Sequence, residues 1–210
     1  MKLPHYDKKS IRGRMYTLIK NIFLPMLALS VFILCLLIIY YLQYSSVSSN
    51  IINASGFNQN FKNDVDLKMY YFVSGSSDQL PWEEVQTARE LAETLLANTK
   101  NSESRKAISS VLHLCDNLNA SIEKIENTKG YDNRIEQLEN NIYVISELIE
   151  EYLYTYLYYE AGEIASLQNS LRYWLAAEII AAVVFTVIIA TASAKKAFRI
   201  SKSITDPIDA

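Results

Sequence analysis

The chain contains few of the residue types that build turns, disulfides and metal sites. Its 210 residues include 5 Gly, 4 Pro, 2 Cys and 2 His. Turns are built largely from Gly and Pro, so this scarcity argues against a loop-rich all-β protein or a disordered chain and favours helix. Cys35 lies in an apolar segment and Cys115 in an acidic one, so we expect no disulfide between them. Two Cys and two His at unrelated positions also predict no metal site.

The motifs that mark common enzymes are missing as well. There is no P-loop, no dinucleotide-binding glycine pattern and no nucleophile elbow in the sequence. We therefore expect no catalytic residue, no cofactor and no nucleic-acid partner for this chain.

Two long apolar blocks are the main feature that is present. Residues 22–42 form 21 consecutive positions without a charge, which as a helix would span about 32 Å, close to the hydrocarbon thickness of a bilayer. Residues 173–194 form a second block of 22 residues, interrupted only by Glu178. Both blocks are predicted to be transmembrane helices. The length of the first block and the 21 residues before it favour an uncleaved anchor over a signal peptide.

The distribution of charge predicts the orientation of these two helices. Residues 1–21 and 195–210 are both rich in Lys and Arg, which places them in the cytoplasm by the positive-inside rule. Residues 43–172 contain 19 acidic against 10 basic residues, a net charge of −9. We therefore expect a cell-membrane protein with two spans, a basic cytoplasmic N-terminus, an extracellular segment at 43–172 and both termini inside.

Apolar residues of the extracellular segment recur in alternating steps of three and four, which is the spacing of a helical face. The first run comprises Ile108, Val111, Cys115, Leu118, Ile122 and Ile125. The second comprises Ile135, Leu138, Ile142, Ile145, Ile149, Tyr152, Tyr156 and Tyr159. Heptad seams of this kind pack helices against one another.

Turn-forming residues divide the segment into four helical passes. The first continues out of the first apolar block to about residue 72, and the next two cover about 81–98 and 103–128. The last begins after Asp132 and continues into the second apolar block. The predicted fold class is therefore all-α, with two transmembrane helices flanking an extracellular antiparallel four-helix bundle.

Helix lengths predict a homodimer. The second and third passes would span only about 27 Å and 38 Å, whereas the fourth covers about 60 Å before the membrane. The first and fourth helices would therefore continue alone toward the bilayer. We expect a second copy of the chain to cover their exposed seam.

A dense group of tyrosines follows Glu150 and Glu151. Tyr152, Tyr156 and Tyr159 lie beside carboxylates and are candidate ligand-binding residues for a cationic or sugar-like molecule. The same three residues continue the heptad seam, so packing in the core or in the dimer is the alternative interpretation. The identity of any extracellular ligand stays open.

Glu178 is unusual because a carboxylate inside a membrane span is costly and normally faces protein. Tyr41, near the outer end of the first apolar block, is a candidate partner for it, as is Tyr40. The alternative is that Glu178 reaches interfacial water. Gly162, in the fourth predicted helix, is a candidate hinge or a tolerated helical glycine.

The segment after the second apolar block resembles the start of a HAMP linker, the module that joins a membrane span to a cytoplasmic signalling domain. The similarity rests on one basic residue, spaced aliphatics and a Pro followed by an aliphatic: Arg199, Ile200, Ile204, Pro207 and Ile208. The sequence Ser-Ile-Thr-Asp-Pro-Ile is most similar to the corresponding segment of sensor histidine kinases of the YesM type from Gram-positive bacteria. Residues 195–210 are therefore expected to begin a truncated HAMP linker.

The resemblance implies that the chain is the input region of a two-component sensor. The kinase domain would lie in sequence beyond Ala210, and a cytoplasmic response regulator would be a partner only through that kinase domain. The chain is then a fragment of a longer receptor or a natural truncation. A signal would pass from the outer bundle through the fourth helix, with Gly162, Arg199 and Pro207 as relay positions. A chemoreceptor input region and a structural membrane protein are the alternatives.

Overall fold

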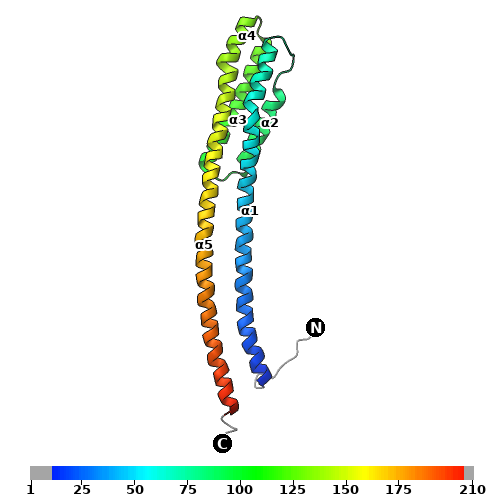
Figure 1. The fold of residues 1–210 in the computed structure, drawn as a ribbon. Helices are drawn as coiled ribbons and strands as arrows, with labels where there is room; N and C mark the ends of the chain where they lie inside the picture. Colours follow the sequence, from blue (N-terminus) through cyan, green and yellow to red (C-terminus); the bar gives the residue numbers. More distant parts are fainter. Residues whose placement is uncertain (1–10, 206–210) are drawn as a thin grey trace, which may run out of the picture. The chain divides into compact units, whose positions relative to one another are not determined.

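The computed structural model describes residues 11–205, and helices account for nearly all of them (Figure 1). No strand occurs in this part of the chain. The elements are α1 (Ile11–Val73), α2 (Trp82–Asn98), α3 (Ser102–Asn127), α4 (Tyr131–Gln137), the π-helix η1 (Leu138–Ile142) and α5 (Tyr143–Thr205). The prediction of an all-helical chain is confirmed.

The chain divides into two compact units. One comprises Met1–Tyr41 together with Asn169–Ala210, and the other comprises Leu42–Gln168. We call them the apolar unit and the core unit. Their boundaries fall close to the predicted limits of the segment between the two apolar blocks.

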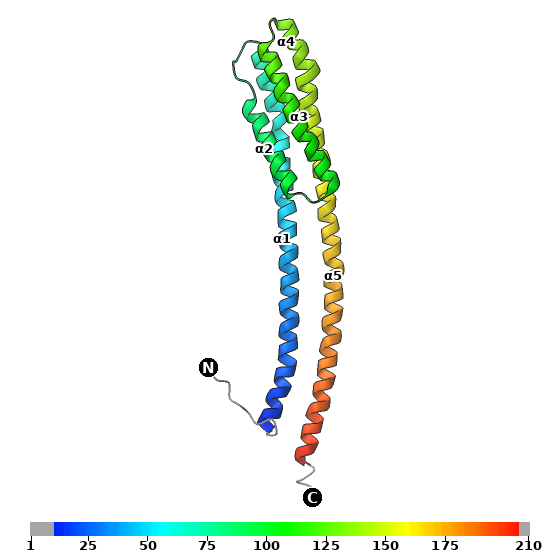
Figure 2. The same ribbon diagram turned by 180° about the vertical axis from the view of Figure 1, so that it is seen from behind.

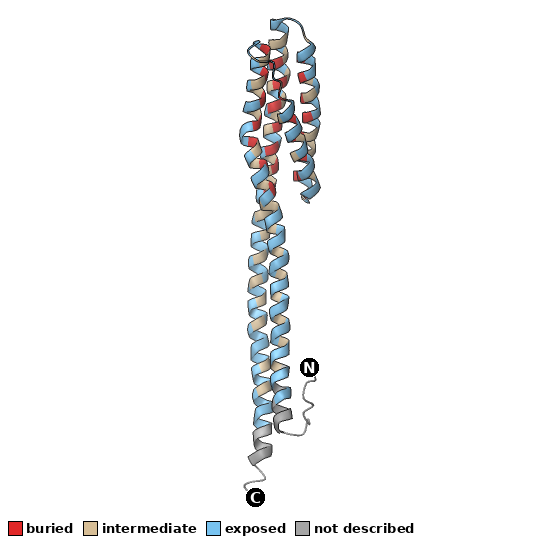
Figure 3. Cartoon of the chain, turned by 90° about the vertical axis from the view of Figure 1, so that its right-hand side faces the viewer, coloured by how far each residue is buried: buried red, intermediate tan, exposed pale blue. Residues whose placement is uncertain are grey.

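In the apolar unit, hydrophobic side chains are exposed instead of buried. No residue of 22–41 or 173–194 is buried (Figure 3). The exposed fractions reach 65% at Phe23 and 64% at Ile179. A core helix of a soluble protein buries such side chains, whereas a lipid-facing helix presents them to the bilayer. By length and composition, α1 and α5 can both cross a membrane.

One stripe of each apolar segment is less exposed than the rest. It recurs at helical spacing in α1 at Ile22, Pro25, Leu29, Ile33, Leu36 and Tyr40, and in α5 at Leu171, Leu175, Glu178 and Ala182. Glu178 therefore lies on the more protected face of α5. Trp174, on the same helix, is 66% exposed.

The core unit is held together by an apolar core to which each of its helices contributes. In α2 the buried face consists of Val85, Ala88, Ala92 and Leu95. In α3 the whole predicted seam from Ile108 to Ile125 is buried, which confirms that prediction. These two helices lie side by side, and α3 also contacts α4 and η1 (Figure 2).

Polar contacts join the helices around this core. The Ser146 hydroxyl donates a 2.7 Å hydrogen bond to Asp66 and links α5 to α1. Lys68 pairs with Glu84 and links α1 to α2. The Arg134 guanidinium on α4 lies over the ring of Phe72 on α1, 5.2 Å from its centroid.

Glycines permit the turns at two places where the backbone is left-handed. Gly75 has φ of 72° directly after α1, and Gly130 has φ of 90° directly before α4. A side chain would strain both positions. The helix ends around them lie within about two residues of those predicted, which is the usual spread of helix assignments.

The fourth predicted helix departs from its predicted register. The π-helix η1 interrupts it, and the buried positions that follow run Leu138, Ile142, Ser146, Ile149, Leu153, Tyr156 and Glu160. The predicted seam was therefore wrong at Tyr152, which is 38% exposed, and at Tyr159, which is only partly buried. From Ile142 onward the buried positions still alternate steps of four and three, but in the opposite phase to the prediction. This change of phase follows η1, because a π-helical turn inserts one extra residue into the α-helical ladder. Leu153 and Glu160 take the places expected for those two tyrosines.

Candidate functional site

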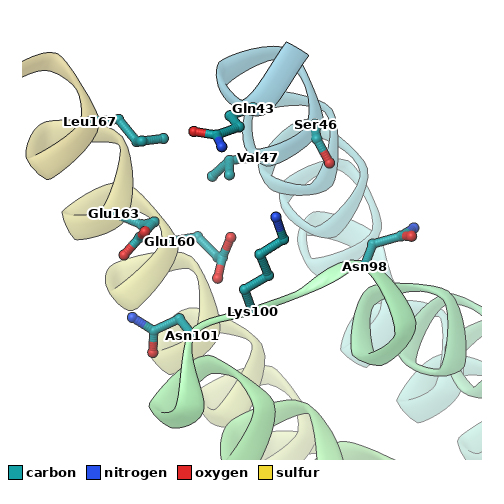
Figure 4. A pocket seen from close by; sticks show the side chains of 9 residues that line it. All are labelled: Gln43, Ser46, Val47, Asn98, Lys100, Asn101, Glu160, Glu163 and Leu167. Atoms are coloured by element: carbon teal, nitrogen blue, oxygen red, sulfur yellow. The ribbon is translucent and has the colours of Figure 1, made fainter. Parts of the chain in front are cut away.

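A cavity of about 200 Å³ lies in the core unit, at the connection between α2 and α3. The side chains around it come from α1, from α5 and from the connection itself (Figure 4). Its lining comprises Gln43, Ser46, Val47, Asn98, Lys100, Asn101, Glu160, Glu163 and Leu167.

The α2–α3 connection is short and well fixed. Its first residue, Thr99, is extended and ends α2, and Asn101 caps α3 by accepting hydrogen bonds from the backbone N–H groups of Glu103 and Ser104. Capping by Asn satisfies donors that a helix otherwise leaves unpaired. The Arg105 guanidinium donates to the carbonyls of Leu96 and Thr99, at 2.6 Å and 3.1 Å, and ties α3 back to the end of α2. The loop side of the cavity is therefore held in place.

Glu160 is the buried charge-bearing group of the cavity. Its side chain is on α5, only 2% of the residue is exposed, and its Oε1 atom has no hydrogen-bond partner within residues 11–205. Burial raises the pKa of this carboxyl, the nearby Ser104 hydroxyl works in the opposite direction, and Glu163 raises the pKa further. The Ser104 hydroxyl has no partner of hydrogen-bond geometry in the described residues. A buried carboxylate oxygen without a partner is costly.

Lys100 supplies the positive charge of the lining. Figure 4 shows its side chain reaching from the loop into the space that Glu160 enters from α5. Lys100 itself is exposed, and no ion pair joins it to Glu160 or Glu163 in the described part of the chain. The cavity therefore carries two carboxylates and one ammonium group that are not paired with one another.

A buried polar contact lies one helical turn from Glu160. The Tyr156 hydroxyl is 3.2 Å from the Thr99 hydroxyl, and Tyr156 is fully buried. Burial raises the pKa of Tyr156 to about 12, opposed by hydrogen bonds with Thr99 and Asn50. This tyrosine is neutral at physiological pH, and it fixes the end of α2 against α5 and α1.

The three candidate tyrosines do not converge on one site. Tyr156 is inside the core, Tyr152 is exposed, and Tyr159 is half-buried, with its ring in edge contact with Tyr158 at 5.6 Å. Their side chains therefore form no common cage.

Of the remaining sequence-based candidates, none belongs to the cavity. Tyr41 is 67% exposed, and no hydrogen bond to Glu178 is present within residues 11–205. Gly162 is exposed, with open space where a Cβ atom would be, so its α-helical conformation needs no glycine. Arg199 lies exposed near the end of α5. Pro207 is outside the described residues.

Sequence reasoning missed Glu160, Lys100 and the cavity. A signal for Glu160 was present, since steps of four, three and four from Ile149 lead through Leu153 and Tyr156 to it. The predicted seam took steps of three, four and three from Ile149 and led to Tyr159 instead. No pattern in the sequence marks Lys100, because its placement depends on how the α2–α3 connection meets α1 and α5.

The lining consists mainly of polar groups that can bind a ligand. It offers carboxylates, amides, one hydroxyl and one ammonium group. Cys115 lies in the core, where burial raises the pKa of its thiol to about 12, so it is no nucleophile at neutral pH. No group of three or more metal-ligating side chains occurs in the described residues.

Comparison of the chain with protein-family models, with curated proteins and with solved structures finds no match.

Proposed function

We propose that the chain is the extracellular-sensing input region of a bacterial two-component sensor histidine kinase. In this proposal α1 and α5 cross the membrane, both termini lie in the cytoplasm, and the core unit is an extracellular antiparallel four-helix bundle. The exposed apolar surface of the two helices supports the spans. The net charge of −9 between the two apolar blocks, against basic ends, supports the orientation.

The observation that carries the proposal is the continuity of α5. This helix runs without interruption from Tyr143 to Thr205. It contributes Tyr156 to the core, Glu160 to the cavity and an apolar stretch at 173–194. A change of packing around Glu160 acts on the same helix that would cross the membrane, so a shift, rotation or tilt can be transmitted without a joint.

The cytoplasmic side of the proposal rests on the resemblance of residues 195–210 to a HAMP linker. Arg199 and Pro207 match its basic and proline positions. In this proposal the linker would connect α5 to a kinase domain, and the response regulator would be a separate protein that the kinase phosphorylates. A homodimer is part of this proposal. Tyr154 and Tyr158, one turn apart on α5 and 56% and 76% exposed, are surface aromatics suited to such an interface.

Topology is the direct test. In a Cys35→Ser background, a Ser76→Cys variant carries its thiol in the exposed turn after α1. We expect a membrane-impermeant maleimide to label it in intact cells. The matched variant Ser10→Cys is expected to be labelled only after permeabilisation. Labelling of Ser10→Cys in intact cells, or protection of Ser76→Cys, would overturn the proposed orientation.

Transmission through α5 is tested by insertion. Two alanines added after Gly162 rotate the downstream helix by about 200° relative to the core unit and lengthen it by about 3 Å. We expect phosphorylation of the response regulator by the full-length receptor to lose its dependence on signal. The same insertion after Ser76, in the turn, is the control and should leave signalling intact. Unchanged signalling after the Gly162 insertion would exclude a rigid relay.

A further inference from the structure

We propose that the cavity between α1, α5 and the α2–α3 connection binds a small molecule with a primary ammonium group, for which Glu160 is the counter-ion. The inference assigns a ligand class to the proposed sensor, and its meaning in signalling rests on that proposed function. The binding itself does not, because it depends only on side chains of the core unit.

The first support is the state of Glu160. Its carboxylate is withdrawn from water, lines the cavity, and keeps Oε1 without a partner in the described chain. Burying an unpaired charge is unfavourable, and a cation that donates a hydrogen bond removes that cost. Glu160 therefore lacks a hydrogen-bond donor, and a positively charged ligand would supply one.

The second support is the balance of charge and acceptors. Glu160 and Glu163 provide two negative charges against the single positive charge of Lys100, so the lining favours a cation over an anion. Further oxygen acceptors come from the side chains of Gln43, Ser46 and Asn98, whereas the side-chain oxygen of Asn101 already caps α3. A primary ammonium group has three N–H donors to match such acceptors.

The lining also discriminates between kinds of cation. Quaternary ammonium groups are held by aromatic faces, and no aromatic ring is among the side chains that line this cavity in residues 11–205. Val47 and Leu167 supply apolar surface next to the polar groups. A volume of about 200 Å³ suits a small molecule. A short alkyl chain bearing one primary amine fits this combination.

Lys100 acts as an internal competitor in this proposal. Its ammonium group enters the same space but forms no ion pair with Glu160 in the described residues. A ligand ammonium group near Glu160 must displace or repel it. The α2–α3 connection that carries Lys100 would therefore respond to ligand, together with α5.

The test measures binding of ethylammonium chloride to the full chain in lipid nanodiscs by saturation-transfer-difference NMR, with empty nanodiscs as the blank and constant ionic strength. We expect saturable binding to the wild-type chain. Glu160→Gln should weaken it at least about tenfold, since a charge-assisted hydrogen bond is lost. Glu151→Gln, an exposed glutamate on the same helix, is the matched control and should change the affinity less than about twofold. Lys100→Met should strengthen binding.

Absence of saturable binding to the wild-type chain, or equal affinity in Glu160→Gln, would overturn the proposal. Tetramethylammonium binding as tightly as ethylammonium would overturn the assignment to primary amines. Far-ultraviolet circular dichroism verifies that each variant is folded. Should Glu160→Gln not fold, Lys100→Met decides, because unchanged or weaker binding in that variant contradicts the proposal. If ethylammonium does not bind but maleimide labelling shows the expected topology, only the proposed ligand site is contradicted. If ethylammonium binds but the labelling contradicts the expected topology, only the proposed sensor function is contradicted.

Discussion

The hydroxyl groups of Tyr156 and Thr99 lie 3.2 Å apart in the buried core, although the two residues are 57 positions apart in sequence. One belongs to α5 and the other ends α2. This contact holds the α2–α3 connection against the long helix, directly before the loop residue Lys100 and one turn before Glu160. The position of the cavity therefore depends on a hydrogen bond that is internal to the core.

Replacement of Tyr156 by Phe tests this contact. The ring stays, but the Thr99 hydroxyl loses its buried partner, so we expect a loss of about 1 kcal/mol of stability. For a chain of this length, that corresponds to a fall in Tm of about 2–4 °C. Thermal unfolding of the full chain in detergent micelles, followed by circular dichroism at 222 nm, measures it. Tyr131→Phe, at a residue 58% exposed, is the control and should leave Tm unchanged.

Asn58 is a position at which we expect a substitution to stabilise the protein. It is 3% exposed on the core face of α1, and neither its Oδ1 nor its Nδ2 atom has a hydrogen-bond partner within residues 11–205. Asn58→Leu replaces these unpaired polar atoms with an apolar group of similar size. We expect stabilisation by about 1–3 kcal/mol, measured as a rise in Tm. Asn60→Leu, at an exposed position of the same helix, should have little effect, and a lower Tm for Asn58→Leu would show that the amide has an essential partner.

Glu160 predicts a pH dependence of stability. Burial raises the pKa of its carboxyl in the folded protein above its ordinary value of 4.5, with Glu163 adding to the rise and Ser104 opposing it. The folded state then holds its proton to higher pH than the unfolded state. Its contribution to stability therefore falls as pH rises from about 4.5 through the raised folded pKa.

The measurement compares Tm of the wild-type chain and Glu160→Gln from pH 4 to pH 8. The Glu160→Gln variant has no proton to lose at this position. We therefore expect the Tm of the variant to rise relative to that of wild type as the pH increases from 4 to 8. Lys100 is the cation that faces the same cavity, and Lys100→Met should enlarge the pH dependence of the wild-type background. Parallel Tm curves for wild type and Glu160→Gln would contradict a raised pKa.

The π-helix η1 predicts an asymmetric tolerance to deletions. A π-helical turn accommodates one residue more than an α-helical ladder, so deletion of the exposed Asn140 should convert Leu138–Ile142 to α-helix and leave its flanks in phase. Unfolding should stay cooperative, with Tm near that of wild type. Deletion of the exposed Glu151, in regular α-helix, rotates Leu153 and Tyr156 by about 100° away from the core and should abolish cooperative unfolding. Equal damage from both deletions would show that η1 is required.

Much of the fold was predictable because it depends on local periodicity. The seam of α3 contains an apolar residue at every expected step, and all of these are buried. The helix ends near Phe72, Asn98 and Asp132 were readable from Gly, Pro and capping residues. The register of the last helix was not predictable in the same way. The predicted seam turned Ile145 and Tyr152 inward, whereas the structure buries Ser146 and Leu153, each one residue further along, and both sets have the same seven-residue spacing.

The sequence by itself determined that the chain is helical and that two of its segments are apolar enough to cross a membrane, because hydrophobic spacing and the absence of charge act within one helix. The tertiary structure alone decided which face of α5 is buried, because the buried positions change phase after the π-helix η1. It also decided where Glu160, Lys100 and Thr99 come together. Glu160 lies on α5, whereas Thr99 and Lys100 lie in the α2–α3 connection about 60 residues earlier, and no local pattern encodes the distance between them.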